Sequence, residues 1–311
     1  MILRHNTNRY LWKGKGPTAV QPAKVSVIVP AYNESKTIRQ VIDNITSLSA
    51  DLEVIVVDDG STDDTALIAK DAGATVYSHP YNIGNGAAVK TGIRNADGEI
   101  LVFIDADAQH DASDLRKILQ YFPDYDMVVG SRSLSQQASW GRAIGNKTYN
   151  WLASYVAKFS VEDLTSGFRA IKSHIARRFL YLLPNTYSYP TTLTLGLLRN
   201  GSSVKYIPIN VHNRKTGKSK ISPFRDAVRF LMIIIKICTL YSPLRIFLPV
   251  SFFMFLLGLS YYAYTYMAWG RFTNMSALLF TTSILIFMMG LVSEQICQMR
   301  FDRSEDDKSR D

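Results

Sequence analysis

Two long apolar segments near the C-terminus constrain this 311-residue chain more than any other feature. Residues 246–268 carry no charged side chain, and neither do residues 272–293. Each run is about 22 residues long, and roughly 20 helical residues span the hydrocarbon core of a bilayer. We therefore predict two transmembrane helices, at about 246–268 and 274–296, joined by a short loop. A pair of buried core helices is the less favoured alternative.

The charges around these runs predict an orientation. Basic residues flank the pair on its outer sides: Arg225, Arg229, Lys236 and Arg245 before it, Arg300 and Arg303 after it. The connecting loop contains only Arg271. Because Lys and Arg mark the cytoplasmic side of a membrane protein, we expect both termini and the large N-terminal part to be cytoplasmic. The basic opening of the chain lacks the apolar core of a signal peptide.

We divide the rest of the chain by its hydrophobic pattern. Residues 1–23 are predicted to form a basic arm and residues 24–221 a folded domain. Residues 222–243 are predicted to form amphipathic helices in the membrane interface, because basic residues interrupt their apolar sequence; an ordinary buried helix is the alternative. The transmembrane pair occupies 244–299, and 300–311 is a charged tail. In this context the net charge of +9 favours lipid headgroups and phosphate substrates over nucleic acid.

Short apolar strands alternate with amphipathic helices in the predicted domain. The strand-like runs are 25–30, 54–57, 76–78, 100–104, 127–129 and 204–211. This alternation predicts a mostly parallel sheet with helices on both faces. Polar clusters follow three of the strands, at 32–34, 58–59 and 105–107. Since ligands bind at the carboxyl ends of the strands in such sheets, we expect these clusters to converge on one edge.

Asp105 and Asp107 form the most informative of these clusters. On a continuing strand their carboxylates would point to opposite faces, so convergence requires the strand to end at Ile104 or Asp105 and the chain to turn. Two converging carboxylates suit Mg²⁺ or Mn²⁺, which prefer carboxylate and phosphate oxygens. The alternative is a solvated loop that caps the next helix.

The ordered set of motifs resembles the inverting family 2 glycosyltransferases of the GT-A fold. The closest resemblance is to the subgroup of dolichol-phosphate mannose synthase and the bacterial polyprenyl-phosphate glucosyltransferases. The motifs are V-I-V-P-A-Y-N-E at 27–34, V-D-D-G-S at 57–61, D-A-D at 105–107 with Gln109, G-S-R at 130–132, D-L-T-S-G-F-R at 163–169, and Arg214 with G-K-S-K at 217–220. The resemblance implies an α/β fold: a Rossmann-like, mostly parallel sheet with helices on both faces, followed by interfacial helices and a two-helix transmembrane hairpin.

The resemblance also implies the donor site. Asp107 is expected to be the main metal ligand, with Asp105 nearer the ribose and Gln109 completing the metal site. The implied nucleotide-binding residues are Pro30, Tyr32, Glu34, Asp58, Asp59, Asp105, Arg214 and Lys220. For Glu34, a helix N-terminal acid favoured by the helix dipole is an alternative. The basic loop 212–220 is interpreted as a lid on the diphosphate or as a surface for lipid headgroups.

The charge of the expected acceptor, a lipid phosphate, indicates which residues would bind it. A lipid phosphate is already anionic at neutral pH, so it needs cations to hold it rather than a general base. The resemblance places Arg132, Arg142 and Asn146 against this phosphate, and a solvated helix face is the alternative for Arg142. Asp163 is expected to orient the sugar or an arginine, with Arg169 as a candidate partner or simply as a structural pair. The catalytic set is therefore Asp107, Asp163, Arg132 and Arg142.

The implied function is the transfer of one sugar, most simply mannose or glucose, from a GDP- or UDP-linked nucleotide diphospho-sugar. The acceptor is a polyprenyl (dolichyl or undecaprenyl) phosphate on the cytoplasmic face, and the transfer inverts the anomeric centre. The chain lacks the Q-x-x-R-W motif of processive synthases. Two alternatives stay open: transfer to a lipid-linked sugar or polysaccharide with Asp163 as general base, and a non-catalytic membrane scaffold. Two spans per chain are also compatible with a homo-oligomer.

Overall fold

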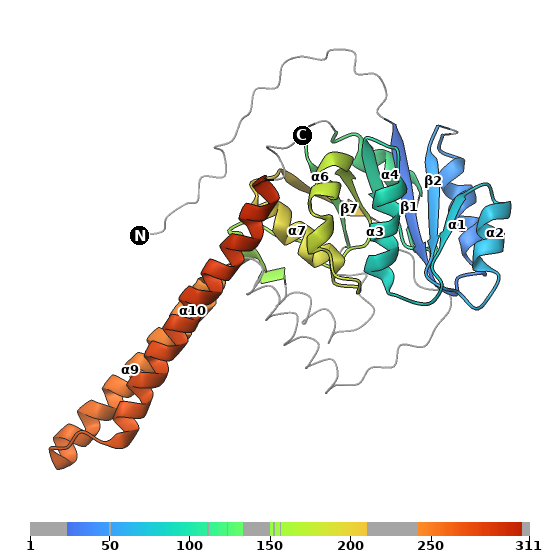
Figure 1. The fold of residues 1–311 in the computed structure, drawn as a ribbon. Coiled ribbons are helices and arrows are strands. Elements are labelled where there is room, and N and C mark those ends of the chain that lie inside the picture. Colours follow the sequence, from blue (N-terminus) through green and yellow to red (C-terminus); the bar gives the residue numbers. More distant parts are fainter. Residues whose placement is uncertain are drawn as a thin grey trace.

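The computed structural model describes residues 24–49, 51–110, 112–122, 124–132, 150–151, 153–155, 157–209 and 242–306. A seven-stranded sheet forms the centre of the folded domain, and two long helices project from it as a hairpin (Figure 1). The predicted N-terminal arm, the basic loop and nearly all of the predicted interfacial segment lie outside the described residues, so those predictions stay predictions.

The sheet is mostly parallel, as the sequence pattern predicts. Its strands are β1 (Val25–Ala31), β2 (Glu53–Asp58), β3 (Thr75–Ser78), β4 (Ile100–Phe103), β5 (Met127–Arg132), β6 (Arg169–Lys172) and β7 (Val204–Ile209). They lie in the order β3-β2-β1-β4-β6-β5-β7. Every pair of neighbours is parallel except those that involve β6, which runs antiparallel to β4 and to β5.

Strand β6 is not predicted by the sequence pattern, which indicates a polar loop ending at Arg169 and then a helix. Only Ala170 and Ile171 are apolar in its four residues, so no alternation is visible. The strand exists because β4 and β5 lie on either side of it, with Arg169 in register with Phe103 and with Val129. As a result, the loop that precedes Arg169 is held beside the carboxyl end of β4.

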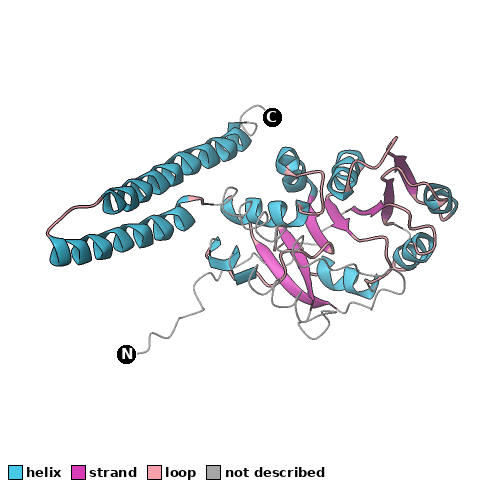
Figure 2. Cartoon of the chain, turned by 90° about the horizontal axis from the view of Figure 1, so that it is seen from below, coloured by secondary structure: helices cyan, strands magenta, loops and turns pink. Residues whose placement is uncertain are grey.

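Helices cover both faces of the sheet (Figure 2). They are α1 (Ile38–Thr46), α2 (Thr65–Asp71), α3 (Asn85–Asn95), α4 (Ala112–Leu119), α6 (Ser173–Arg178) and α7 (Tyr189–Arg199). Helices α1, α2 and α4 pack on one face, and α3, α6 and α7 on the other. Alternate strand residues therefore serve different cores: Val27 and Val29 face the first, and Ile28 faces the second.

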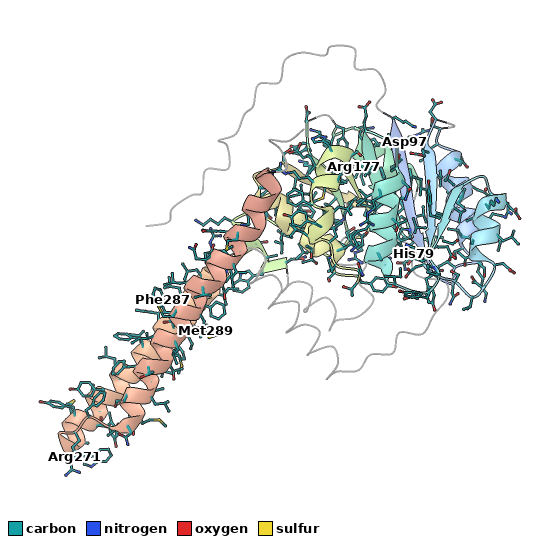
Figure 3. The ribbon with its side chains drawn as sticks, viewed as in Figure 1. His79, Asp97, Arg177, Arg271, Phe287 and Met289 are labelled. Carbon is teal, nitrogen blue, oxygen red and sulfur yellow. The ribbon has the colours of Figure 1, made fainter. Side chains whose placement is uncertain are left out.

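The hairpin consists of α9 (Leu244–Trp269) and α10 (Asn274–Asp306). Both helices are long and apolar enough to cross a membrane, which agrees with the two predicted spans. Small polar residues join them: Ser251 Oγ donates to the Ser283 carbonyl at 2.9 Å, and Ser283 Oγ donates to the Ser251 carbonyl at 2.8 Å. Small side chains let membrane helices approach closely. Larger apolar side chains such as Phe287 and Met289 lie on the outside (Figure 3).

Asp126 supplies the first test of this packing. Its carboxylate accepts hydrogen bonds from Lys172 Nζ and from the Ser203 N–H, both at 2.9 Å. Burial alone would raise the pKa of Asp126, but these hydrogen bonds hold the pKa below its usual range. We expect Asp126→Asn to lower the free energy of unfolding by about 1–3 kcal/mol at pH 7. Thermal unfolding in detergent would measure this loss.

The same variant has an expected pH dependence. A carboxyl whose folded pKa is lowered stabilises the protein fully above its unfolded pKa of about 3.9, and this contribution is lost as the pH falls through the folded value. The difference between wild type and Asp126→Asn should therefore be constant from pH 8 to pH 5 and shrink below about pH 4. A difference that grows in acid would contradict the assignment.

Candidate active site

The polar clusters that follow the strands meet at one edge of the sheet. A pocket of about 300 Å³ lies at the carboxyl ends of β1, β2 and β4. Its predicted members are Pro30, Tyr32, Glu34, Asp59, Asp105 and Asp107, and its others are Ala31, Asn82, Gly84, Asn85, Ala88, Ala106 and Tyr187. Asp58 does not line the pocket; its carboxylate accepts the Ser61 N–H at 3.3 Å.

The D-x-D segment turns as its proposed role requires. Strand β4 ends at Phe103, two residues before Asp105. Ala108 then adopts a left-handed backbone with φ of +56°, and the Gln109 N–H donates to Asp107 Oδ1 at 3.2 Å. Asp105 and Asp107 consequently line the same pocket, whereas Gln109 is not among its lining residues.

This arrangement suits a cation that takes some of its ligands from the protein and the others from a bound substrate. Among the residues that the structure describes, no group of three His, Cys, Asp or Glu side chains is arranged to hold a metal. Two carboxylates beside a pocket are a common protein contribution to Mg²⁺ or Mn²⁺ that is bound together with phosphate oxygens. The donor set therefore fits a metal diphosphate better than a metal alone.

Asp59 organises the opposite wall of the pocket. Its carboxylate lies 2.7 Å from His79 Nδ1 and accepts the N–H groups of Ile83 and Gly84 at 3.0 and 2.8 Å. The other His79 nitrogen, Nε2, is 2.9 Å from Thr91 Oγ1. Asp59 therefore holds the glycine-rich turn that opens α3, a positioning role that the sequence motif alone does not indicate.

Glu34 lies at the junction of the pocket and α1. Its N–H donates to Thr65 Oγ1 at 2.9 Å, and its carboxylate accepts the Thr37 hydroxyl at 3.1 Å. Glu34 thus lines the pocket, four residues ahead of the first residue of α1, and the first turn of that helix contains no acidic residue.

The loop 184–188 forms a wall that sequence reasoning missed. Its Asn185 carbonyl accepts the Gly86 N–H at 3.0 Å, and the Leu183 carbonyl accepts Lys90 Nζ at 3.2 Å. Tyr187 is 80% exposed and lines the pocket. The glycines at 84 and 86 signal that another backbone comes close, but nothing in the sequence says which segment does so.

Arg132 and Asp163 form a second cluster beside the pocket. Arg132 Nε donates to Asp163 Oδ2 at 2.8 Å and Nη2 donates to Oδ1 at 3.1 Å, which makes a two-pronged ion pair. Arg132 also donates to Thr165 Oγ1 at 2.7 Å. Burial alone would raise the pKa of Asp163, but the hydrogen bonds and charge of Arg132 hold it below the usual range.

The candidate partnership of Asp163 with Arg169 is wrong. The Arg169 side chain is fully buried and donates to the carbonyls of Ser166 and Pro190 and to Thr194 Oγ1. Because Arg169 belongs to the unexpected strand β6, its side chain lies inside the domain rather than beside the carboxylate. It locks the loop after Asp163 onto α7.

Gly167 connects the two clusters. A Cβ atom at this position would lie 2.5 Å from Asp105 Oδ2, so the backbone of the 163–169 loop lies directly against that carboxylate. His110 lies close by, stacked on Phe168 with ring centroids 5.0 Å apart. Burial lowers the pKa of His110, although the charge of Asp107 opposes the shift. The D-x-D carboxylates and the Arg132–Asp163 pair are therefore parts of one site.

Comparison with known proteins identifies the family and the fold. Residues 26–181 match the family model for glycosyl transferase family 2, and residues 242–299 match the model for the GtrB C-terminal hairpin. The chain belongs to glycosyl transferase family 2. The second match covers α9 and most of α10, so this glycosyltransferase is membrane-anchored through its hairpin.

Two relatives carry names that describe a reaction. The chain is 28% identical, over 72% of its length and 70% of the relative, to undecaprenyl-phosphate 4-deoxy-4-formamido-L-arabinose transferase of Proteus mirabilis. It is 27% identical, over 67% of its length and 85% of the relative, to polyprenol monophosphomannose synthase of Mycolicibacterium smegmatis.

A solved structure shares the fold. Glucosyl-3-phosphoglycerate synthase of Mycobacterium tuberculosis, in complex with Mn²⁺, uridine diphosphate and glucosyl-3-phosphoglycerate, superposes with a TM-score of 0.55. It is 22% identical and covers 70% of this chain and 80% of its own. The likeness establishes a GT-A architecture for the glycosyltransferase.

Four predicted site residues of the glycosyltransferase cannot be placed. Arg142 and Asn146, predicted to contact the acceptor, lie outside the described residues, as do Arg214 and Lys220 of the basic loop. Their roles stay predictions.

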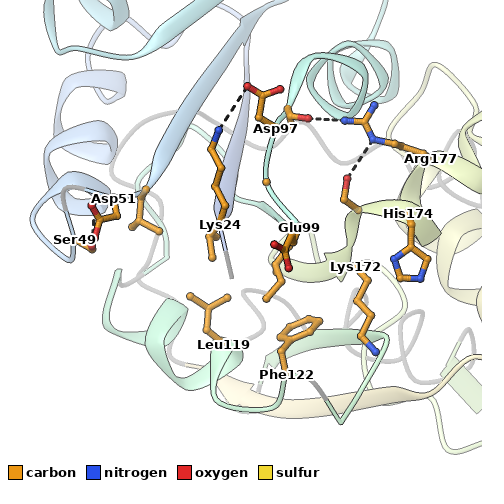
Figure 4. A pocket seen from close by; sticks show the side chains of 16 residues that line it. Lys24, Ser49, Asp51, Asp97, Glu99, Leu119, Phe122, Lys172, His174 and Arg177 are labelled. Atoms are coloured by element: carbon orange, nitrogen blue, oxygen red, sulfur yellow. Dashed lines mark hydrogen bonds and ion pairs between the residues drawn. The ribbon is translucent and has the colours of Figure 1, made fainter. Parts of the chain in front are cut away.

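A larger cavity lies at the opposite edge of the sheet of the glycosyltransferase. It measures about 1200 Å³ and lies among Lys24, Asp97, Lys172 and Arg177 at the amino ends of the central strands (Figure 4). Several of its polar groups already have protein partners; for example, Lys24 Nζ is 3.6 Å from Asp97. Because the predicted polar clusters that follow β1, β2 and β4 lie at the carboxyl ends, the smaller pocket is the candidate active site.

The closeness of loop 184–188 gives a test of the donor pocket. A Cβ at Gly86 would overlap the Pro184 carbonyl oxygen and lie 2.8 Å from that of Thr186. We expect Gly86→Ala to push the loop and Tyr187 away and to weaken nucleotide diphosphate binding at least tenfold, a loss of about 1.4 kcal/mol. Isothermal titration with UDP and GDP would measure it.

Gly73→Ala serves as the matched control. Gly73 has a φ of +87°, so alanine is strained there, but no atom of the described residues lies within 4 Å of the added carbon. This variant should lose stability and keep the affinity for nucleotide. Equal affinities for Gly86→Ala and Gly73→Ala would contradict a role for the loop in the pocket.

Proposed function

We propose that this glycosyltransferase moves a single sugar from a nucleotide diphospho-sugar to a polyprenyl phosphate at the membrane surface, with inversion. The supporting observation is the combination, in one chain, of a two-carboxylate pocket, an adjacent arginine and a membrane hairpin. The names of the two relatives, which both specify a polyprenyl-phosphate sugar, agree with this proposal.

The donor would bind in the 300 Å³ pocket. Asp107 would be the main ligand of Mg²⁺ or Mn²⁺, Asp105 would complete the carboxylate pair near the ribose, and Gln109 would approach from the same turn. A divalent cation held there would neutralise charge on the departing diphosphate of UDP or GDP. Pro30, Tyr32 and Glu34 would wall the nucleotide.

Asp58 and Asp59 would both shape the nucleotide pocket. Asp59 is part of its wall, whereas Asp58 lies outside it. Asp59 fixes the turn at Gly84 through backbone hydrogen bonds. Its carboxylate would therefore shape the space for base and ribose, with Asp58 supporting the neighbouring turn at Ser61. Arg214 and Lys220 would close on the diphosphate.

An anionic acceptor suits the second cluster. Asp163 is bound to Arg132 through both carboxylate oxygens, and its pKa is lowered, so it is a poor proton acceptor. Arg132 keeps 33% of its side chain exposed, so it can also meet a phosphate. Arg142 and Asn146 would add further contacts. A sugar hydroxyl acceptor would need a base, and Asp163 is not arranged to be one.

The proposed placement in the membrane follows from charge. Basic residues lie outside the two spans, and the loop between them has only Arg271, so the catalytic domain and both termini would be cytoplasmic. The division into an arm at 1–23, a catalytic domain at 24–221, interfacial helices at 222–243, a hairpin at 244–299 and a tail at 300–311 belongs to the same proposal. Self-association through the hairpin is compatible with it.

The deciding experiment offers purified enzyme a choice of substrates in proteoliposomes. A panel of UDP- and GDP-sugars would be combined with a long-chain polyprenyl phosphate, with a lipid-linked sugar, or with no acceptor, in Mg²⁺ and in Mn²⁺. We expect a lipid-linked monosaccharide, detected by mass, only with the polyprenyl phosphate. Product formed only on the lipid-linked sugar would overturn the proposed acceptor, and no transfer from any donor would support a scaffold.

A further inference from the structure

Arg199, at the last residue of α7, joins the catalytic domain to the hairpin. Its Nη1 donates to Cys297 Sγ at 2.8 Å, and its Nη2 lies 3.9 Å from Glu294 Oε1. Both partners lie on α10. The contact is largely enclosed, because Arg199 and Glu294 each keep only 17% of their side chains exposed and Cys297 is buried. An enclosed ion pair is less screened by solvent than a surface pair.

Glu294 also ties the two hairpin helices together. Its Oε2 accepts the Ser242 hydroxyl at 3.1 Å and the Leu244 N–H at 3.2 Å, so it satisfies a backbone donor at the first residue of α9. Ile246, two residues further along α9, packs against the core of the catalytic domain. One carboxylate therefore links the start of α9, the end of the spanning part of α10, and α7.

The other end of α7 belongs to the active site. The Pro190 carbonyl and Thr194 Oγ1, in its first turns, hold the buried Arg169, which locks the loop beside Asp105. The segment just before α7 carries Tyr187, which lines the donor pocket. With 11 residues, α7 is about 16 Å long. In Figure 1, α7 lies between the sheet and the hairpin.

We infer that the Arg199–Glu294 contact positions the donor site relative to the bilayer, with α7 as the rigid connection. The inference rests on the proposed function, in which the acceptor phosphate lies at the membrane surface while the donor is held in the domain. Arg199 and Glu294 are positioning residues: they touch neither substrate. A loosened contact would let the catalytic domain tilt on the hairpin and misplace the two reacting groups.

The kinetic test compares two acceptors on the same enzyme. One is a long-chain polyprenyl phosphate in proteoliposomes, and the other is a short, water-soluble prenyl phosphate that can reach the pocket at any tilt of the domain. For Arg199→Met and Glu294→Gln we expect kcat/KM to fall about 10- to 100-fold with the long acceptor, since small misplacements of reacting groups have such costs. Values with the short acceptor should stay unchanged.

Two further variants sharpen this comparison. Arg199→Lys keeps the charge and should recover part of the loss. Arg39→Met removes an exposed arginine on α1 and should change neither acceptor. Equal losses with both acceptors would show that Arg199 supports only folding and would overturn the inference, as would no loss with either. A wild-type enzyme that uses neither acceptor would instead refute the proposed function.

A distance measurement tests the inference without activity. Spin labels would be attached to cysteines introduced at Leu67 on α2 and Met267 near the hairpin tip, which are 58% and 88% exposed. Cys238 would be replaced by serine, and the buried Cys297 kept. We expect a narrow distribution of the distance between the two labels when Arg199 is present. In the same labelled protein with Arg199→Met, we expect a broader distribution. An unchanged width would overturn the inference whatever the acceptor proves to be.

Discussion

Asp107→Asn is expected to lower kcat/KM for sugar transfer by about three orders of magnitude, because carboxylate-bound metal contributes several kcal/mol of transition-state stabilisation. Asparagine has the same size and keeps an oxygen that can accept the Gln109 N–H, so the turn after β4 should persist. The loss then reports the charge of the carboxylate. Product formation would be measured by mass with polyprenyl phosphate and saturating donor, across a titration of Mg²⁺ and Mn²⁺.

Two comparisons make this result specific. Asp43→Asn removes an exposed carboxylate on α1 that does not line the pocket, and should leave transfer intact. Partial recovery of Asp107→Asn at high metal concentration would agree with weakened metal binding. A wild-type rate in Asp107→Asn at every metal concentration would remove Asp107 from the metal site.

The parts of the fold that were predictable depend on local patterns. The hairpin is visible because a run without charges is long enough to span a bilayer, and the strands before Tyr32, Asp58 and Asp105 are visible because each is a short apolar run that ends in polar residues. In a parallel sheet those ends must share an edge. One local rule therefore brings together residues far apart in the sequence.

The parts that were missed depend on contacts between distant segments. Strand β6 has only two apolar residues, and it is a strand because β4 and β5 leave a gap for it. The position of β6 determines that Asp163 contacts Arg132, which lies 31 residues earlier in the sequence. It also determines that the Arg169 side chain is buried inside the domain. Tyr187 reaches the proposed donor pocket because its loop contacts Gly86. No periodicity or spacing in the sequence predicts these contacts.

Asp163→Asn is expected to lower kcat/KM with polyprenyl phosphate by about 100-fold, or 2.7 kcal/mol. Removing one member of a largely buried ion pair leaves its partner uncompensated, which is more costly than the pair itself is stabilising. Arg132 would keep at most one of the two hydrogen bonds that orient it and would no longer present its guanidinium in one orientation. Steady-state kinetics at fixed donor would show the loss, mainly as a higher KM for the acceptor.

The pH profile distinguishes this role from general-base catalysis. Because the pKa of Asp163 is held below its usual range, Asp163 is ionised throughout pH 5–8 and should produce no acidic limb there. An acidic limb near pH 6 in wild type that disappears in Asp163→Asn would assign it as a base and favour a hydroxyl acceptor.

Arg132→Gln completes the argument as a double-mutant cycle. If Arg132 and Asp163 act as one unit, the double variant should lose no more activity than the worse single variant, because each substitution already dismantles the pair. Losses that add would mean that the two side chains act separately, with Arg132 on the acceptor and Asp163 on another group. The cycle thus measures whether the ion pair, rather than either residue alone, prepares the site for an anionic acceptor.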